Sequence, residues 1–496
     1  MRWLRTSIFV SVTALLSVCL DYALGSSASE GHANALIDAL SPEAKVYFPN
    51  STEFSTLTSR WSSLAEPIVN VAVVPATEDD VVKIVQYANK ANLPILAFNG
   101  AHAAITTLGR MHGGIEIYLG QLSSVNIAPD NKTVTVGGGT LSKNVTDTLW
   151  SAGKETVTGT CECVSVLGPG LGGGHGWLQG HYGLVTDQFV SMNVVLADGT
   201  LQTIDADSDL WWGMKGAGQN FGIVTSLTSK IYDRSQTDWA IETLIFDGDN
   251  VEALYQAAND HFSNIPVDLI NWSYWLNIPT ADPNKPIILF YIIQEGVTSV
   301  DPTYTKPFHD IGPISVEADS GTYKDLAAWV QIAVDSAPCQ KAGLAHPRFP
   351  AYIKEYNISA QKLAYEAYAA NVSGDSPFSS SIYMFEGYPV QGVQAIDGDS
   401  AAFAFRSDNI LTAPLITYTP AGKELDDQAA ELGNRLREII HQGTGSNELH
   451  TYVNYAYGDE TPQNWYGYEQ WRQDRLKALK NKYDPEGRFS FFAPVQ

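Results

Sequence analysis

Hydrophobic and polar positions change period along residues 70–98. VAVVP (71–75) is predicted to be extended and ends at Pro75, and PILAF returns as a second strand. Between them the apolar residues follow helical spacing, and Thr77 stands where a helix cap is expected. The helical set is Val81, Ile84, Val85 and Ala88. This stretch predicts a strand, a capped helix and a strand.

The same alternation continues to residue 232. GIEIYL (114–119) and TVTVGGG (133–139) predict strands, and LSKNVTDTLWSAG predicts a helix that ends at Gly153. NVVLADGTLQTID (193–205) predicts a hairpin that turns at Asp198-Gly199. Residues 209–232 run from a helical start through glycines into a strand. Alternating helices and strands indicate an α+β domain with mixed sheets.

Beyond residue 236 tyrosine and tryptophan become frequent, and the pattern changes. PIILFYIIQ (286–294) predicts a strand, and residues 423–442 predict a helix with one apolar face. A last helix in the tail is predicted to stop at Asp484-Pro485. The 496 residues are enough for two or three cores.

The first 25 residues have the pattern of a secretory signal. Arg2 and Arg5 precede an apolar stretch at 7–20 that is too short to span a bilayer comfortably. Ala23 and Gly25 fit a cleavage site near Gly25, and a membrane anchor is the alternative. Six Asn-X-Ser/Thr sites support export as a glycoprotein: Asn50, Asn131, Asn144, Asn271, Asn357 and Asn371.

Charge and cysteine content narrow the class of protein. The formal net charge of −24 repels phosphate backbones and anionic lipid, so nucleic acid is excluded as an expected partner. Signal cleavage would remove Cys19 and leave Cys161, Cys163 and Cys339. An odd number in an oxidising compartment leaves one cysteine free, intermolecular or otherwise bonded.

Glycines next to two of these cysteines suggest a phosphate-binding loop. GPGLGG (168–173) matches G-x-G-x-x-G, but Pro169 and the glycines that follow make a poor helix start, so a Rossmann fold is rejected. Glycine backbone can still approach a pyrophosphate closely. A purely structural turn is the alternative. A metal site fits poorly, because the histidines lack close ligand spacing and the cysteines form no CxxC pair.

A second candidate loop is LAFNGAH (96–102), where His102 leaves a predicted strand on a tight turn. The alternative is an ordinary surface histidine. Several motifs follow in a fixed order: NGAH (99–102), GTCxxV (159–164), LGGGHG (171–176), YGLVTD (182–187), DLWWGMKGAGQNFGIVT (209–225), YVNY (452–455) and KYDPEGRF (482–489).

Together these motifs resemble the FAD-linked oxidases of the vanillyl-alcohol-oxidase class, in the berberine bridge enzyme-like branch, over nearly the whole mature chain. The resemblance implies an α+β fold with a PCMH-type FAD-binding domain of two α/β subdomains and a substrate domain whose antiparallel sheet is covered by helices. The implied boundaries are a signal peptide at 1–25, the FAD-binding domain at 26–235, the substrate domain at 236–445 and a C-terminal segment at 446–496 that returns to the FAD domain.

The resemblance also implies a covalently bound FAD. His102 stands where the family bonds the flavin 8α-methyl carbon, and Cys161 where many members bond ring carbon C6. Cys163 could then pair with Cys339. Cys161 and Cys163 would share a face of an extended segment, so the choice between them stays open. Family members usually carry a basic residue and Ser-Gly-Gly before the histidine, whereas this chain has Phe98-Asn99-Gly100-Ala101, so the loop must differ.

The residues implied to contact the cofactor lie in five segments. Val164 stands at the position that gates oxygen, and its size is the one associated with oxidases. The full set is Asn99, Gly100, Ala101, His102, Cys161, Val164, Gly168, Gly172, Gly173, Gly174, His175, Gly176, Gly183, Leu184, Asp187, Gly222, Ile223 and Asn454.

The implied reaction is hydride transfer from an alcohol, amine or activated C–H to the flavin, with O₂ giving H₂O₂. Tyr452 and Tyr455, which flank Asn454, or Glu386 could supply the base; otherwise they are packing residues and a solvated charge. Arg406 is expected on the substrate side. The expected partners are a small molecule and O₂, without nucleic acid or membrane after signal removal, for a secreted monomer.

Other functions stay open at this point. A carbohydrate oxidase, for which the aromatic run NWSYWLN (271–277) would suit stacking, competes with an enzyme of small metabolites. A flavin-dependent dehydrogenase or cyclase and a secreted flavin-carrying binding protein are further alternatives. Peroxide release in air would separate an oxidase from the last three.

Overall fold

The computed structural model describes residues 35–496, and the predicted signal peptide lies outside this range. Its first sheet has the order β1-β2-β4-β3, with strands Lys45–Tyr47, Ile68–Val74, His112–Tyr118 and Ile95–Phe98. β2 and β3 both pair with β4 in parallel. Helix α3, Glu78–Ala91, makes the crossover between β2 and β3, and Thr77 caps it through a capping box with Asp80. The predicted strand-helix-strand unit is confirmed.

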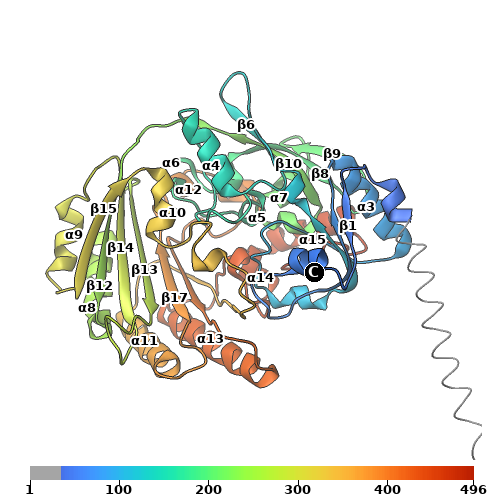
Figure 1. Ribbon diagram of the computed structural model, residues 1–496. Coiled ribbons are helices and arrows are strands. Elements are labelled where there is room, and N and C mark those ends of the chain that lie inside the picture. The colour runs from blue at the N-terminus through green and yellow to red at the C-terminus, as the bar shows by residue number, and fades with distance from the viewer. Residues whose placement is uncertain (1–34) are drawn as a thin grey trace, which may run out of the picture.

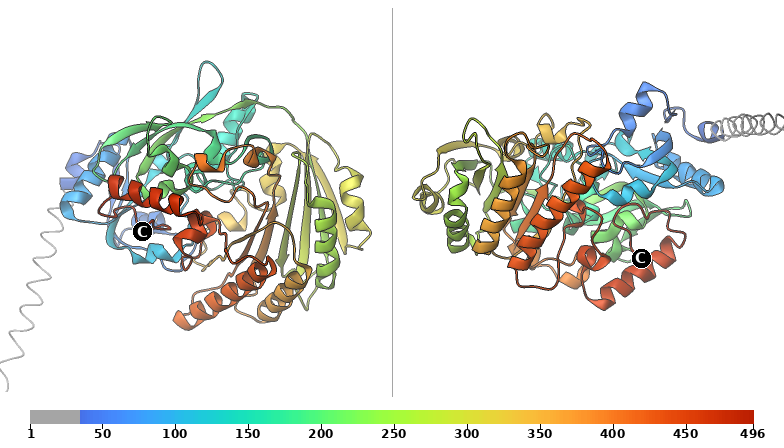
Figure 2. Two further views of the ribbon diagram at one scale, coloured as in Figure 1. Left: turned by 180° about the vertical axis from the view of Figure 1, so that it is seen from behind. Right: turned by 90° about the horizontal axis from the view of Figure 1, so that it is seen from below.

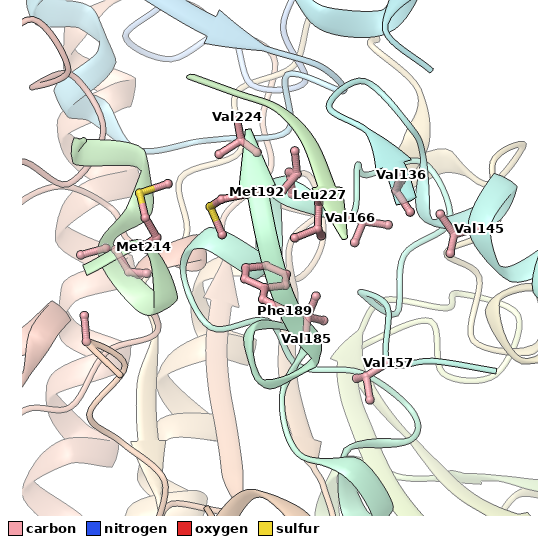
Figure 3. Close-up of a cluster of buried hydrophobic side chains, with 14 of the residues drawn as sticks. Val136, Val145, Val157, Val166, Val185, Phe189, Met192, Met214, Val224 and Leu227 are labelled. Carbon is pink, nitrogen blue, oxygen red and sulfur yellow. The ribbon is translucent and has the colours of Figure 1, made fainter. Parts of the chain in front are cut away.

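A second, antiparallel sheet follows with the order β5-β6-β10-β8-β9. Its strands are Val125–Ile127, Thr133–Gly137, Ile223–Lys230, Phe189–Val195 and Leu201–Asp205. The predicted helices are α4, Ser142–Ser151, and α7, Trp211–Ala217. The predicted hairpin joins β8 and β9, and Gly199 adopts a φ of +80° in its turn. Figure 3 shows the valine-rich core on one face of this sheet.

The other half of the molecule is a seven-stranded antiparallel sheet with the order β15-β12-β14-β13-β17-β18-β16. The strands are Ser315–Gly321, Trp239–Phe246, Ile287–Glu295, Leu269–Leu276, Ile382–Gly387, Ile410–Leu415 and Ala351–Ile353. Helices α8 (Val251–Phe262), α11 (Ile358–Val372) and α13 (Lys423–Gly443) cover one face, as Figures 1 and 2 show. The other face turns toward the first half. This is the architecture that the resemblance implied.

Strict alternation along these strands separates two cores. On β13, Leu269 and Trp275 pack with the covering helices, whereas Ile270 and Trp272 pack with the core of the first half. Asn271 lies on the same strand, and its amide Nδ2 donates to the Tyr291 carbonyl at 2.9 Å. It is 4% exposed, so the sequon at this position cannot carry a glycan in the folded protein.

The C-terminal segment returns to the first half (Figure 2). Helix α15, Gln470–Tyr483, ends at Asp484, which accepts from Lys480 Nζ at 2.6 Å. Buried Asn220 then holds the last residues, because its side chain donates to the Ala493 carbonyl and accepts from the Val495 amide. No helix among residues 35–496 is long and apolar enough to cross a bilayer.

Candidate active site

Three loops of the first half meet beside the end of β3. The Asn99 side chain donates to the Gly139 carbonyl at 2.5 Å, and the Ser142 amide donates to the Val164 carbonyl at 2.8 Å. A Cβ on Gly100 would lie 2.9 Å from the Cys163 carbonyl oxygen, so only glycine allows this approach. Loops after β3, after β6 and before α5 (Leu167–Leu171) therefore form one site.

The loop after β3 presents a row of free backbone donors. None of the N–H groups of residues 100–105 donates to a backbone acceptor within the described chain. Ala101 has a φ of +55°, a left-handed conformation that an alanine adopts at a cost. Successive N–H groups in such a turn form an anion-binding concavity. The loop thus fits the pyrophosphate of a dinucleotide, despite lacking the family's Ser-Gly-Gly.

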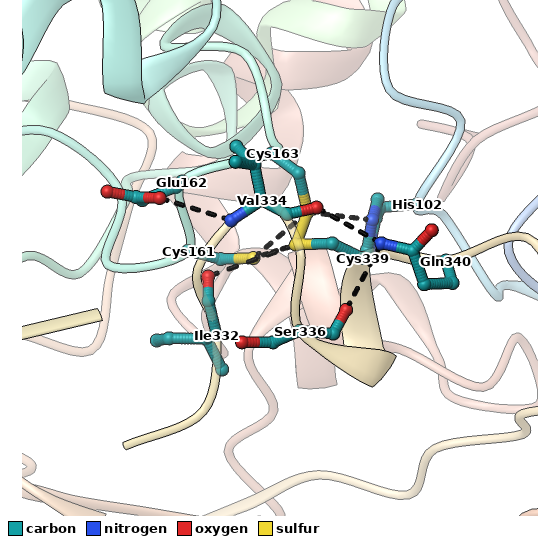
Figure 4. Close-up of a disulfide and its surroundings, with 9 residues drawn as sticks. All are labelled: His102, Cys161, Glu162, Cys163, Ile332, Val334, Ser336, Cys339 and Gln340. Atoms are coloured by element: carbon teal, nitrogen blue, oxygen red, sulfur yellow. Dashed lines mark hydrogen bonds between the residues drawn. A yellow bond between two sulfur atoms is a disulfide. The ribbon is translucent and has the colours of Figure 1, made fainter. Parts of the chain in front are cut away.

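The three cysteines meet at this loop, and the pairing is resolved (Figure 4). Cys163 is disulfide-bonded to Cys339, and Cys161 is a free thiol. The Cys161 Sγ lies 3.3 Å from the Cys163 Sγ and 3.6 Å from the Cys339 Sγ. The two paired sulfurs and His102 lie within 4.8 Å of one another, but disulfide sulfurs are not thiolate ligands for a metal.

His102 has one ring nitrogen engaged and one available. Its Nε2 lies 3.3 Å from the Cys163 Sγ, and its ring stacks on Trp61 with centroids 5.1 Å apart. Nδ1 forms no hydrogen bond to any residue in the range 35–496. Burial lowers the pKa of His102 to about 3, with the Arg348 cation contributing, so the imidazole is neutral and nucleophilic at pH 7. Burial also raises the pKa of the Cys161 thiol to about 11.

The glycines of LGGGHG pack against other parts of the protein. A Cβ on Gly172 would lie 2.3 Å from Asn454 Oδ1, and one on Gly173 would lie 2.4 Å from the Phe403 ring. A Cβ on Gly174 would meet Val185 at 2.7 Å. Close packing against Asn454 and Phe403 thus accounts for these glycines, as in the structural alternative. A contact with the cofactor remains a prediction for them.

His175 is a fully hydrogen-bonded core residue. Its Nδ1 bonds to Gln179 Oε1 at 2.8 Å and its Nε2 to the Tyr352 hydroxyl at 2.7 Å. Its ring also stacks on Tyr388. Burial lowers the pKa of His175 to about 4. The histidine therefore positions the surrounding tyrosines rather than presenting a free group.

The candidate base residues form one network on the inward face of the large sheet. Glu386 stands opposite Trp272 in the register of β17 and β13, on the face turned to the first half. Its carboxylate accepts from the Tyr455 hydroxyl at 3.0 Å and from the Tyr388 hydroxyl at 2.8 Å. Burial raises the pKa of Glu386, partly offset by these two hydrogen bonds.

Tyr452 is held differently from Tyr455. Its oxygen accepts from the His175 amide at 3.3 Å and from the Asn454 side chain at 2.8 Å. Asn454 also donates to the Pro169 carbonyl, which ties this segment to the glycine loop. Burial raises the pKa of Tyr452 to about 12, and that of Tyr455 is raised further.

Arg348 belongs to this site and was missed in the sequence, where HPRFP carries no motif. Its guanidinium lies 4.1 Å from the centroid of the Tyr455 ring and 5.0 Å from that of Trp61. The cation favours the phenolate of Tyr455 and the carboxylate of Glu386 by Coulombic attraction. Only the fold brings it to these groups.

The expectation for Arg406 is not confirmed. Its guanidinium is buried and grips both carboxylate oxygens of Asp187 at 2.7 and 2.9 Å. Asp187 also accepts from the Leu184 amide at 2.8 Å, so its carboxylate fixes the loop that follows Gly183. The other predicted cofactor positions lie in different surroundings. Gly168 is exposed, Gly176 packs against Thr158 and Gly222 packs against Val194. Ile223 is the first residue of β10.

Comparisons with known proteins identify the family and the fold. Residues 69–205 match the FAD binding domain family. The chain is 59% identical over 463 residues to FAD-linked oxidoreductase chyH of Penicillium rubens, covering 93% of each chain. Two solved structures share its fold at TM-scores of 0.80, with 94% of this chain and 99% of theirs covered: Physcomitrella patens BBE-like 1 (19% identity) and glucooligosaccharide oxidase from Acremonium strictum (17%).

The curated relative covers nearly the full length and carries the same cofactor in its name. The protein is thus an enzyme, an FAD-linked oxidoreductase, and FAD is its cofactor. The sheets of this chain share the fold of the BBE-like structure over 94% of its length. The chain belongs to the family of FAD-linked oxidoreductases, and it has the fold of the BBE-like structure from Physcomitrella patens.

Proposed function

We propose that the protein is a secreted oxidase whose FAD is bonded to both His102 and Cys161. It would oxidise an alcohol, amine or activated C–H of a small organic molecule and pass the electrons to O₂. The observation that carries the proposal is the cysteine cluster. Two of its sulfurs are tied to each other, so one thiol and one imidazole nitrogen remain available at the same loop.

The residues that would hold the cofactor follow from the loop geometry. The free N–H groups of residues 100–105 would donate to the pyrophosphate. His102 would bond through Nδ1, because its Nε2 faces the disulfide. A 6-S-cysteinyl, 8 alpha-N1-histidyl FAD is described for the glucooligosaccharide oxidase, which shares the fold. Since burial keeps the Cys161 thiol protonated, we expect the bond to Cys161 to form more slowly than the bond to His102 and faster at higher pH.

When bound, FAD supplies the acceptor for hydride and the route to O₂. The chain supplies the base. Tyr455 would take the proton from the substrate group while its own hydroxyl proton moves to Glu386 Oε1, 3.0 Å away. Arg348 over the Tyr455 ring stabilises the negative charge that develops there. Tyr388 holds the second oxygen of Glu386 and fixes the orientation of the carboxylate.

The test is acid precipitation of the purified enzyme. A covalent flavin stays in the pellet, and a tryptic digest should join the His102 and Cys161 peptides through one flavin. His102→Ala and Cys161→Ala should each retain flavin through the other residue, and the double variant should release it. A parent that releases its flavin in acid would contradict the two-bond proposal. Peroxide formed in air during turnover distinguishes the oxidase from a dehydrogenase, a cyclase or a binding protein.

The aromatic run at 271–277, which suggested a carbohydrate substrate, does not offer its tryptophan rings to a ligand. Trp272 is 1% exposed and stacks on Trp177 with centroids 4.6 Å apart. Trp275 is fully buried on the opposite face of the sheet, beside Tyr383. Neither ring is free to stack on a sugar. A small organic molecule other than a carbohydrate is therefore the better supported substrate class.

A further inference from the structure

Arg348 is a cation that has no direct ion-pair partner among the described residues. Its side chain forms no salt bridge and no hydrogen bond with any residue in the range 35–496, and its Nε is buried without a partner. The contacts it makes are to ring faces, those of Tyr455 and Trp61. Stacking uses the face of a guanidinium and leaves its in-plane N–H groups free to form a fork. An unsatisfied buried donor is costly, so this guanidinium edge is available to a ligand.

No neighbouring group within residues 35–496 forms an ion pair with this guanidinium, although it attracts the Glu386 carboxylate at longer range. His102 and His346 stack on the two sides of Trp61, and burial lowers their pKa values to about 3 and about 4, so both are uncharged at pH 7. Glu386 is the nearby acid, but its two oxygens accept from Tyr455 and Tyr388. Arg348 would therefore attract a further negative group placed beside it.

The expected position of the flavin indicates that the negative group beside Arg348 belongs to the substrate. This step rests on the proposed function. The flavin 8α and C6 positions belong to its benzenoid ring, and the carbonyl that carries negative charge on reduction lies at the opposite, pyrimidine end. Arg348 reaches Trp61, which stacks on His102, so it sits at the benzenoid end. It also covers the ring of the candidate base, so it lies within a small molecule's length of the carbon to be oxidised.

We propose that Arg348 binds a carboxylate of the substrate through its free guanidinium edge, and that the enzyme oxidises a small organic acid rather than a neutral sugar. A planar guanidinium matches a carboxylate with two parallel hydrogen bonds. The strongly negative protein surface would not attract such an anion, so recognition has to come from a cation inside the site.

The experiment compares two probes of equal shape, benzoate and benzamide, on the flavin-loaded enzyme. Binding is followed by the change in the flavin absorbance spectrum, which reports only on the site. We expect benzoate to bind at least about tenfold more tightly than benzamide, as for a charge-assisted hydrogen bond. Arg348→Met should abolish this preference without weakening benzamide. Arg348→Lys, a point charge without the fork, should restore part of it.

Arg234→Met is the matched control. Arg234 is also half-buried over an aromatic ring, 4.0 Å from the Trp150 centroid, but it lies outside the site and donates to the Trp150 carbonyl. It should keep the parental preference. Equal binding of the two probes to the parent, or a preference that survives Arg348→Met, would overturn the inference. Flavin content of each variant separates this result from a failure of the proposed function, which would show as loss of the acid-stable flavin from the parent.

Discussion

Two charges act on different parts of Tyr455. Glu386 accepts its hydroxyl proton, and Arg348 lies over its ring. The first interaction gives the phenol proton an acceptor, although the charge of the carboxylate raises the pKa of Tyr455, and the second favours the phenolate. Tyr452 has neither neighbour, since its oxygen accepts from two N–H donors. At the residue scale, these contacts favour Tyr455 together with Glu386 as the base that we propose.

Tyr455→Phe keeps the packing and removes the hydroxyl that bonds to Glu386. We expect the reductive half-reaction, measured anaerobically by stopped flow, to slow by about 10²–10⁴-fold, the usual range for a lost general base. Tyr452→Phe should cost less, because its hydroxyl mainly accepts from the backbone and Asn454. A larger loss in Tyr452→Phe would reverse the assignment.

The pH dependence tests Glu386. The carboxylate must be ionised to receive the Tyr455 proton, and burial raises its pKa above the ordinary value of 4.5. The reductive rate should therefore fall as the pH drops through this raised pKa. Glu386→Gln cannot ionise, so it should be slow and lack that acid limb. A limb that persists in Glu386→Gln belongs to another group.

A different residue, Val164, is the predicted gate for oxygen. Val164 lies beside Gly100, whose added Cβ would sit 3.8 Å from the Val164 Cα. Val164→Leu adds bulk next to the predicted flavin loop and should slow reoxidation by air, while anaerobic reduction by substrate stays near the parental rate. Unchanged reoxidation in stopped flow would show that this residue is not the gate.

The individual residues were predictable where a motif carried them. The sequence located His102 and the cysteines, but Cys161 and Cys163 share a face, and only the position of Cys339 decides which one is free. Arg348 has no motif, because a residue far from the rest of the site in sequence joins it through the fold. The sequence around Asn271 predicts a glycan site, but the structure places this residue in a strand that pairs on both sides.

At the scale of elements, the alternation of side chains between the two faces of a strand positions the candidate site residues. Glu386 and Met384 point to the first half from β17, while Tyr383 and Phe385 pack under the covering helices. A shift of one residue would exchange these faces and remove the carboxylate from Tyr455. Long periodic segments such as 77–91 and 423–442 were predicted well. The strand order was not, because pairing partners distant in sequence leave no local pattern.

The disulfide joins the loop before α5 to the segment after β15, across 176 residues of sequence. The double variant Cys163→Ser/Cys339→Ser removes this link without adding a thiol. We expect a lower thermal midpoint and a loss of about 2–5 kcal/mol in the free energy of unfolding, the range for native disulfides. Equal midpoints for parent and variant would show that the tertiary contacts alone hold the segment.

The whole molecule has two halves that share the site. The first contributes His102 and Cys161, and the second contributes Glu386 and Arg348. The C-terminal segment joins them, since YVNY reaches the glycine loop and the final residues bond to Asn220. The family resemblance implied this arrangement. The residue boundaries of the domains stay predictions.

Export and glycosylation can be tested together. Secretion from a eukaryotic host should give an N-terminus near Ser26 and a mass that falls on deglycosylation. Glycopeptide mapping should find glycans only among the five sites other than Asn271, because that side chain is buried and bonded to Tyr291. An intracellular product that retains Met1 and carries no glycan would contradict secretion. A glycan on Asn271 would contradict its place in β13.

The three neighbouring cysteines also constrain how the enzyme matures, because the sulfurs of Cys163 and Cys339 both lie within 3.6 Å of the Cys161 sulfur. They can pair in three ways, and only the Cys163–Cys339 pair spares the thiol needed for a second flavin bond. If the flavin is held by two bonds, as we propose, a chain that folds with Cys161 in a disulfide would still hold its flavin through His102 and still look yellow. Recombinant batches would then differ in the number of flavin bonds while having the same sequence and colour. The fidelity of oxidative folding, and the isomerase supply of the production host, then sets how much fully assembled enzyme is obtained.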